Sequence, residues 1–319
     1  MIGTSGNDWK VGCYRLPVII RAFTYPERPM EEDILRRFIF EECGVRGEWV
    51  RLSDSWQNAK LNQHGNAVVQ ETLGQALAAA VLLSATIKFE GSVIMQAQGD
   101  GAFRTLVAQA THDRKIRGLV RHAGEVQSGH LESMFGEGRL VLTIRPDNAD
   151  PYQGIVPLKG ANLAAALQTY FVQSEQLDTR LWLFANEQVA AGLLLQELPE
   201  HKDFKTDWER IVMLADTLTA PEMLSLDCES LLRRLFHEEK VRLFDAEPVR
   251  FECTCSKQKI EYALRTLGQQ ELAHLLAEKG AVEVGCEFCN KQYHFDRIDV
   301  QKLLADKLSI YRADTGTQH

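Results

Sequence analysis

The pattern of hydrophobic and polar positions over residues 31–199 predicts a core domain built from both helices and strands. Apolar residues at helical spacing predict a helix over 34–40, and the next stretch, 45–52, has the imperfect alternation of a strand. Residues 66–86 predict one long helix, because Ala, Leu and Val fill positions 76–83 on nearly every side. A helix with so wide an apolar surface is expected at the centre of a domain.

Strand patterns dominate the rest of this region. Alternating apolar residues predict strands over 93–98, 103–109, 116–121, 139–144, 153–158, 180–184 and 190–195. Turns at Gly99-Asp100-Gly101 and His112-Asp113 join the first three strands into an antiparallel meander. A further helix is expected over 162–175. Together these elements predict an α+β fold, with an N-terminal α/β core domain long enough to bury its own core.

The composition changes between residues 200 and 252, where 21 of the 53 residues are Asp, Glu, Lys or Arg. Narrow apolar stripes persist at helical spacing, with Pro221 suited to a helix start and Asp227 to a helix cap. Isolated helices with such stripes are marginal in water, so their order depends on packing against a neighbouring domain. We interpret 200–252 as a charge-rich helical linker, which is either a plain solvated connector or a metastable one.

Four of the seven cysteines form two close pairs, Cys253 with Cys255 and Cys286 with Cys289, and 30 residues separate the pairs. Two short-range pairs of thiolates supply the closed tetrahedral sulfur cage that Zn²⁺ prefers, at about 2.3 Å per bond. The spacing therefore predicts that these four cysteines are metal ligands.

Residues 253–312 predict a small zinc domain around these pairs. Helices are expected over 257–267 and 270–279, each followed by glycine, before a strand, the second cysteine pair and another strand. A unit of about 60 residues has too small a core to be stable alone, whereas structural zinc contributes roughly 10–16 kcal/mol. We therefore expect one Zn²⁺ per chain, and unfolding of this domain without it. His274 and His294 could replace a ligand, but four cysteines already fill the shell.

Thiolates also react with oxidants, which gives the site a second interpretation. Each cysteine has a partner two or three residues away, so oxidation can form Cys253–Cys255 and Cys286–Cys289 disulfides and eject the metal. An inert zinc ribbon is the competing interpretation, and physical chemistry alone favours it, because most four-cysteine zinc sites are structural.

Charge and cysteine content narrow the class of protein. The net charge of −8 and the isoelectric point near 5.7 argue against a nucleic-acid binder that neutralises phosphates. An odd number of cysteines, four of them at metal spacing, favours a reducing compartment, and we expect a cytoplasmic protein. Residues 1–30 are interpreted as a disordered extension, because their one apolar run is too short to span a membrane and no cleavage site is visible. Their excess of Arg and Lys over acidic residues leaves a targeting segment as the alternative.

Several motifs together resemble the 33-kilodalton heat-shock protein family of redox-regulated holdase chaperones. Besides the two cysteine pairs, the motifs that carry the resemblance are Val45-Arg46-Gly47-Glu48, Gln98-Gly99-Asp100-Gly101, Tyr152-Gln153-Gly154, Tyr170 to Leu177, Ala190 to Gln196 and His237-Glu238-Glu239. The resemblance runs from about Ile34 to Arg312, and the combination is far more specific than any single motif.

The resemblance implies an ATP-independent chaperone that is inactive when reduced and zinc-bound. Oxidation of the four cysteines is then expected to release Zn²⁺ and to unfold the linker and the zinc domain. The exposed apolar stripes and the core surface beneath them would bind unfolding client proteins, and the oxidised form would be a homodimer. Cys13, Cys43 and Cys228 lack partners at metal spacing and are treated as structural or incidental.

Other classes of protein fit less well. A zinc-ribbon nucleic-acid or translation factor with a purely structural zinc would share the ribbon, but it should add a basic, aromatic-rich surface. A thiol oxidoreductase would place Cys286 and Cys289 at a helix start in a βαβ unit. The sequence has no nucleophile elbow, phosphate loop or paired-carboxylate pattern, so we expect no enzymatic activity. From the acidic net charge and the short apolar runs we expect no nucleic-acid partner and no membrane partner.

Overall fold

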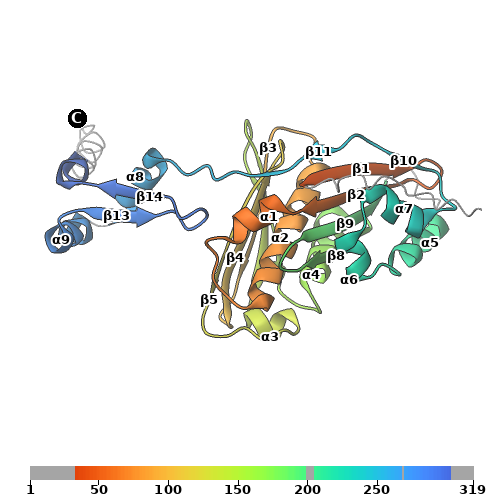
Figure 1. The fold of residues 1–319 in the computed structure, drawn as a ribbon, viewed down its shortest axis with the longest axis horizontal. Helices are drawn as coiled ribbons and strands as arrows, with labels where there is room; N and C mark the ends of the chain where they lie inside the picture. The colour runs from red at the N-terminus through yellow and green to blue at the C-terminus, as the bar shows by residue number, and fades with distance from the viewer. Residues whose placement is uncertain (1–32, 199–204, 268, 303–319) are drawn as a thin grey trace, which may run out of the picture. The chain divides into compact units, whose positions relative to one another are not determined.

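The computed structural model describes residues 33–198, 205–267 and 269–302. Residues 1–30, which we interpreted as a disordered extension and which include Cys13, lie outside the described residues. So do residues 303–312, the last ten of the predicted zinc domain. The described residues form two six-stranded sheets, one two-stranded sheet and several helices (Figure 1). This mixture confirms the α+β fold class.

The first six-stranded sheet combines core strands with strands from the linker. Its members are β1 (Ile34–Phe40), β2 (Val45–Leu52), β8 (Thr179–Ala185), β9 (Ala190–Glu197), β10 (Val241–Leu243) and β11 (Glu247–Pro248). The order is β10-β1-β2-β9-β8, and β11 also pairs with β1. The prediction of a helix over 34–40 is therefore wrong, because strand pairing on both sides of β1 outweighs the local spacing of its apolar residues.

The second six-stranded sheet contains the predicted meander. Its members are β3 (Gly91–Gln98), β4 (Phe103–Thr111), β5 (Lys115–His122), β6 (Arg139–Pro146), β7 (Tyr152–Pro157) and β12 (Arg250–Phe251). The order is β12-β5-β4-β3-β6-β7. The meander is confirmed, since β3, β4 and β5 pair antiparallel in sequence order. Short helices α1 (Asp54–Lys60) and α3 (Leu131–Phe135) lie in the connections.

The long helix α2 (Ala67–Thr86) is buried between these sheets, as its apolar pattern predicted (Figure 1). Asn66 caps the helix, because its Oδ1 atom accepts a hydrogen bond from the Val69 N–H at 3.2 Å. Gly74 allows close approach to the first sheet, since a Cβ atom there would lie 2.7 Å from the Ala185 Cβ. The helix could cross a membrane by length and composition, but 72% of its apolar window is buried inside the protein. It is a core helix.

The helix predicted over 162–175 has two parts. It is α-helical as α4 (Leu163–Tyr170) and continues as a π-helical turn, η1 (Phe171–Glu175). Asn162 caps α4, because its Oδ1 atom accepts a hydrogen bond from the Ala165 N–H at 3.0 Å. Gln176 follows with a φ of 54°, in the left-handed region, and ends the helix before β8.

The linker begins with the helices α5 (Lys205–Ala215), α6 (Ala220–Ser225) and α7 (Cys228–Phe236). As predicted, Pro221 lies in the first turn of α6, and Asp227 caps α7 by accepting a hydrogen bond from the Ser230 N–H at 2.8 Å. The three helices share one buried apolar cluster with the first sheet, to which α7 contributes Leu231 and β2 contributes Trp49. Packing against that sheet supplies the stability that such helices lack alone.

The linker is not helical throughout, contrary to the prediction for 200–252. Its last part forms β10 and β11, which pair antiparallel with β1, and β12, which pairs parallel with β5. Helical periodicity could not reveal this arrangement, because each of these strands is only two or three residues long and is ordered by the sheet edge that it joins.

The C-terminal region has its own small fold. It contains α8 (Lys257–Thr266), α9 (Gln269–Lys279), β13 (Val282–Gly285) and β14 (Gln292–Phe295), with β13 and β14 paired antiparallel. Gly280 follows α9 with a φ of 73°, in the left-handed region that glycine favours. Residues 297–302 are helical, and the Asp296 Oδ1 atom accepts a hydrogen bond from the Asp299 N–H at 2.8 Å, as expected of a cap.

Candidate metal centre

The four paired cysteines lie together in the C-terminal region. The sulfurs of Cys253 and Cys286 are 3.6 Å apart, those of Cys255 and Cys289 are 3.5 Å apart, and all four lie within 4.8 Å of one another. Four sulfurs placed tetrahedrally around one zinc ion at 2.3 Å would be about 3.8 Å apart. The donor set and its spacing therefore fit Zn²⁺.

The first pair lies in an extended segment between β12 and α8. Ser256 follows it directly and caps α8, because the Ser256 Oγ atom accepts a hydrogen bond from the Lys259 N–H at 3.2 Å. The helix start thus fixes the chain direction immediately after Cys255.

The second pair lies in the turn between β13 and β14. The Cys286 N–H donates a hydrogen bond to the Lys291 carbonyl at 3.0 Å, and the Asn290 N–H donates to the Cys286 carbonyl at 2.6 Å. Asn290 has a φ of 56°, a left-handed conformation that asparagine tolerates better than most residues. This turn brings Cys289 back toward Cys286.

Tyr293 adds a contact that sequence reasoning did not single out. Its hydroxyl donates a hydrogen bond to the Cys255 sulfur at 3.1 Å. Burial opposes ionisation of Cys255, but the bond from Tyr293 and those from the neighbouring thiols lower its pKa to about 7. Burial raises the pKa of Cys253 to about 12, and the neighbouring thiols act in the same direction. Cys255 is therefore the more acidic of these two thiols.

A small apolar cluster surrounds the cysteines and is separate from the two clusters of the rest of the described chain. Its buried members other than cysteine are Leu264, Leu272, Val282, Tyr293, Phe295 and Val300. So few buried side chains provide little stability for a domain of this size.

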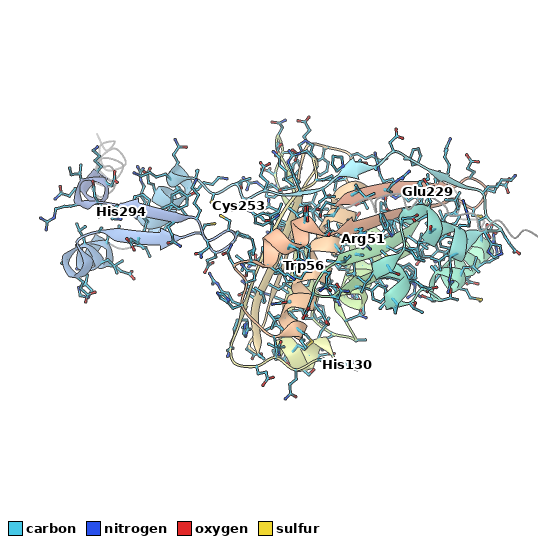
Figure 2. All side chains as sticks on the ribbon, in the orientation of Figure 1. Arg51, Trp56, His130, Glu229, Cys253 and His294 are labelled. Carbon is cyan, nitrogen blue, oxygen red and sulfur yellow. The ribbon has the colours of Figure 1, made fainter. Side chains whose placement is uncertain are left out.

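The two histidines considered as alternative ligands do not join the cysteine cluster. His294 lies on the exposed side of β14, where its Nδ1 atom is 3.6 Å from a carboxylate oxygen of Glu283. His274 is exposed on α9, with Glu278 at 3.6 Å. Figure 2 shows Cys253 and His294 at separate places in this region. The cluster of metal-binding groups consists of the four predicted cysteines.

Cys43 and Cys228 lie elsewhere, buried in the cluster that the linker helices share with the first sheet. The Cys43 sulfur is 3.7 Å from a carboxylate oxygen of Glu239 and 3.6 Å from the Arg210 guanidinium. Neither belongs to the group of four cysteines.

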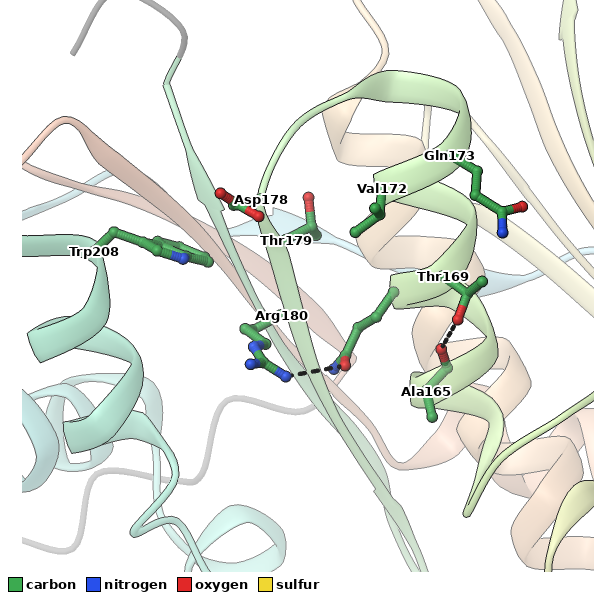
Figure 3. A pocket seen from close by; sticks show the side chains of 9 residues that line it. Ala165, Thr169, Val172, Gln173, Asp178, Thr179, Arg180 and Trp208 are labelled. Carbon is green, nitrogen blue, oxygen red and sulfur yellow. Dashed lines mark hydrogen bonds between the residues drawn. The ribbon is translucent and has the colours of Figure 1, made fainter. Parts of the chain in front are cut away.

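Two cavities lie away from the metal centre. The first, of about 350 Å³, lies where α4 and β8 meet the first linker helix, and Figure 3 shows Trp208 and Val172 on opposite sides with Arg180 between them. Arg180 donates a hydrogen bond to Gln168 at 3.3 Å. The second, of about 310 Å³, lies at the C-terminal end of α2. Among the residues that the structure describes, no cysteine or histidine lines either cavity.

Comparisons with known proteins bear on the resemblance. The family model described as Hsp33 protein matches residues 33–296. The 33 kDa chaperonin of Nitrosococcus oceani is 55% identical over 287 residues, which cover 90% of this chain and 99% of that protein. The 33 kDa chaperonin of Shewanella sp. strain W3-18-1 is 44% identical over 278 residues, covering 87% of this chain and 97% of that protein.

A solved structure agrees on the fold. The crystal structure of the 33 kDa chaperonin from Thermotoga maritima superposes with a TM-score of 0.74 at 23% sequence identity, covering 87% of this chain and 99% of that one. The family match extends from β1 through β14, so it includes the core, the linker and all four clustered cysteines. On this evidence the chain belongs to the Hsp33 protein family.

Proposed function

We propose that this chain is a redox-regulated, ATP-independent holdase chaperone, in which the four-cysteine centre controls access to an apolar surface. The observation that carries the proposal is the cluster of four sulfurs within 4.8 Å, placed directly after a linker whose apolar residues cover one face of a sheet. The name 33 kDa chaperonin, borne by relatives as much as 55% identical, supports the chaperone class.

In the reduced protein, Cys253, Cys255, Cys286 and Cys289 would hold one Zn²⁺ ion. When bound, Zn²⁺ keeps the four sulfurs as thiolates and supplies a closed link between two halves of the region that are 30 residues apart in sequence. Without that link, only the small cluster around Phe295 stabilises the C-terminal region. While Zn²⁺ is bound, the linker would remain packed and the chaperone inactive.

Peroxide would convert each close pair of thiols into a disulfide. One thiolate attacks the O–O bond of the peroxide and becomes a sulfenic acid, and the second thiolate displaces the hydroxyl group from that sulfur. Formation of each disulfide thus transfers two electrons from two thiolates to one hydrogen peroxide, whose oxygens leave as two hydroxide ions and take up two protons from the solvent to become water. Sulfurs paired as Cys253–Cys255 and Cys286–Cys289 no longer carry the charge needed to hold a divalent cation.

Loss of order in the C-terminal region would free the linker, whose strand β12 ends two residues before Cys253. The linker helices cover large side chains of the first sheet, among them Phe38, Phe40 and Trp49, each about 1% exposed. Uncovering this face would create an apolar patch of the kind that binds unfolding proteins. The many charges of the linker would keep the opened protein soluble.

The remaining parts of the proposal concern partners and location. The partners would be unfolding client proteins in the cytoplasm, and the oxidised form would be a homodimer. Holding clients requires no bond-breaking chemistry on them, so the protein would act without enzymatic turnover. These points rest on the family resemblance and on the acidic, cysteine-containing composition.

The proposal is tested by following two signals in one experiment. Zinc-loaded, reduced protein is treated with hydrogen peroxide at raised temperature, while released zinc is measured with a chromogenic chelator and aggregation of a thermally unfolding client by light scattering. Zinc release and client protection should rise together, and a thiol reductant with added zinc should reverse both. Zinc release without protection, or equal protection by the reduced protein, would contradict the proposal.

A further inference from the structure

The end of the linker, residues 241–252, joins the edges of both large sheets. Strands β10 and β11 lie antiparallel along β1, with Phe38 opposite Leu243 and Leu35 opposite Glu247. The chain then crosses to the second sheet, where β12 lies parallel to β5. If this segment leaves, β1 and β5 each become an edge strand. We call the line formed by these two edges the strand seam.

Main-chain hydrogen bonds hold the segment along the whole seam. The Phe244 N–H donates to the Arg37 carbonyl at 2.9 Å, the Val249 N–H to the Asp33 carbonyl at 2.7 Å, and the Glu252 N–H to the Ile116 carbonyl at 3.0 Å. Such bonds do not depend on the side chains of the bound strand, so another extended peptide could form them.

One apolar side chain anchors the segment at the point where it crosses between the sheets. Val249 is 4% exposed and belongs to the main core cluster, which also contains residues of α2. Phe251 packs against the same cluster. Removal of the segment therefore opens an apolar notch between the two edges.

Basic side chains flank this notch. The Arg114 guanidinium, whose side chain is 8% exposed, lies 2.9 Å from a carboxylate oxygen of Glu247, and the Arg37 Nε atom lies 2.8 Å from the other. On the far side of Val249, the Lys115 Nζ atom lies 3.0 Å from the Glu252 carboxylate. Leaving a largely buried guanidinium without its carboxylate is unfavourable, so a replacement strand that carries acidic residues is preferred.

We propose that the strand seam, once vacated, binds an extended segment of an unfolding client by strand addition. The preferred segment carries an apolar residue at the position of Val249 and carboxylates two residues before and three residues after it. In the closed protein the linker segment occupies this site as an internal substitute. This proposal rests on the proposed function, because it requires the linker to leave on oxidation.

The test uses full-length oxidised protein and a fluorescent synthetic peptide of residues Val241 to Glu252. Fluorescence anisotropy should show binding to the oxidised protein and at least about tenfold weaker binding to the reduced protein, whose seam is occupied. A peptide with Glu247→Gln and Glu252→Gln should bind about tenfold more weakly, and a peptide N-methylated at Val249 and Glu252 should lose most of its affinity. A scrambled peptide of the same composition is the control.

Variants of the protein locate the binding site. R37Q and K115Q should each weaken the peptide several-fold without unfolding the core, because the Arg37 side chain is half exposed and that of Lys115 is 27% exposed. R139Q removes an exposed arginine from β6, away from the seam, and should leave affinity unchanged. A saturating amount of the parent peptide should also reduce client protection by the oxidised protein.

The outcomes separate this proposal from the proposed function. One outcome is that the oxidised protein protects clients while the peptide binds without any dependence on its carboxylates or N–H groups, or while the peptide fails to compete with clients. In either case the strand seam is not the client-binding site, and the proposed holdase function stands. If oxidation gives neither protection nor peptide binding, the proposed function fails, and the seam proposal fails with it.

Discussion

The sulfur of Cys253 lies 3.6 Å from the sulfur of Cys286, although the two cysteines are 33 positions apart in the sequence. The contact joins the segment that leaves the linker to the turn between β13 and β14. Any group that binds both sulfurs therefore connects the segment before α8 to the turn between β13 and β14, two parts of the C-terminal region that are distant in the sequence.

Substitution of one clustered cysteine should empty the site. C286S removes one thiolate of four, so zinc content should fall well below one ion per chain, and affinity should fall by at least about tenfold. Amide hydrogen exchange in α8 and α9 should accelerate in parallel. The matched control is C228A, which removes a buried cysteine from the linker cluster and should retain one zinc per chain. Normal zinc content in C286S would rule out the assigned ligands.

Removal of metal from the reduced wild-type protein should unfold the C-terminal region alone. A strong chelator should abolish amide protection in β13 and β14, because structural zinc contributes roughly 10–16 kcal/mol to a fold of this size. Protection in β3 and β4 should persist, since these strands belong to a separate apolar cluster. Hydrogen exchange with mass spectrometry measures both. Retained protection in β13 and β14, once metal analysis shows the zinc gone, would refute metal-dependent folding.

Weakening the contact between linker and core should partly activate the reduced protein. Leu231 of α7 is fully buried against the first sheet, so L231A should cost about 2–5 kcal/mol of packing. The linker helices should then open at lower temperature, and client protection should appear without oxidant. E238A is the control, because the side chain of Glu238 is 85% exposed. If reduced L231A has no more activity than wild type, linker release is not what limits client binding.

Glu48 should make the stability of the core depend on pH. Burial raises its pKa to about 7, despite the opposing charges of Arg46, Arg37 and Arg114, and its Oε2 atom has no hydrogen-bond partner among the described residues. The folded state thus retains a proton that the unfolded chain loses above about pH 4.5. The contribution of Glu48 is complete below that pH and falls by roughly 3 kcal/mol as the pH rises through 7.

The comparison that isolates this effect is wild type against E48Q. Urea unfolding, followed by fluorescence of the buried Trp49 and Trp56, should show E48Q gaining roughly 3 kcal/mol relative to wild type between pH 4.5 and 8. E238Q, at an exposed position, should follow the wild-type curve. Parallel curves for wild type and E48Q would mean that Glu48 ionises normally in the folded protein.

Sequence reasoning succeeded where structure is determined locally. The buried helix α2 and the meander of β3, β4 and β5 follow from apolar periodicity and turn residues, and the spacing of the cysteines identified the four sulfurs that cluster. It failed at β1 and at the end of the linker, because strand pairing between distant segments decides their conformation. Which sulfurs are neighbours, and the bond from Tyr293 to Cys255, depend on tertiary folding that no local pattern encodes.

Oxidation at the cysteines should release the linker helices, the last of which ends at Phe236, 17 positions before Cys253, and hydrogen exchange of α5, α6 and α7 tests this most directly. Exchange is compared between the reduced, zinc-loaded protein and the peroxide-treated protein under conditions in which the latter holds a client. The account predicts that amides from Lys205 to Phe236 lose protection on oxidation while β3, β4 and β5 keep theirs. Full protection of the linker helices in a protein that is holding client would contradict it.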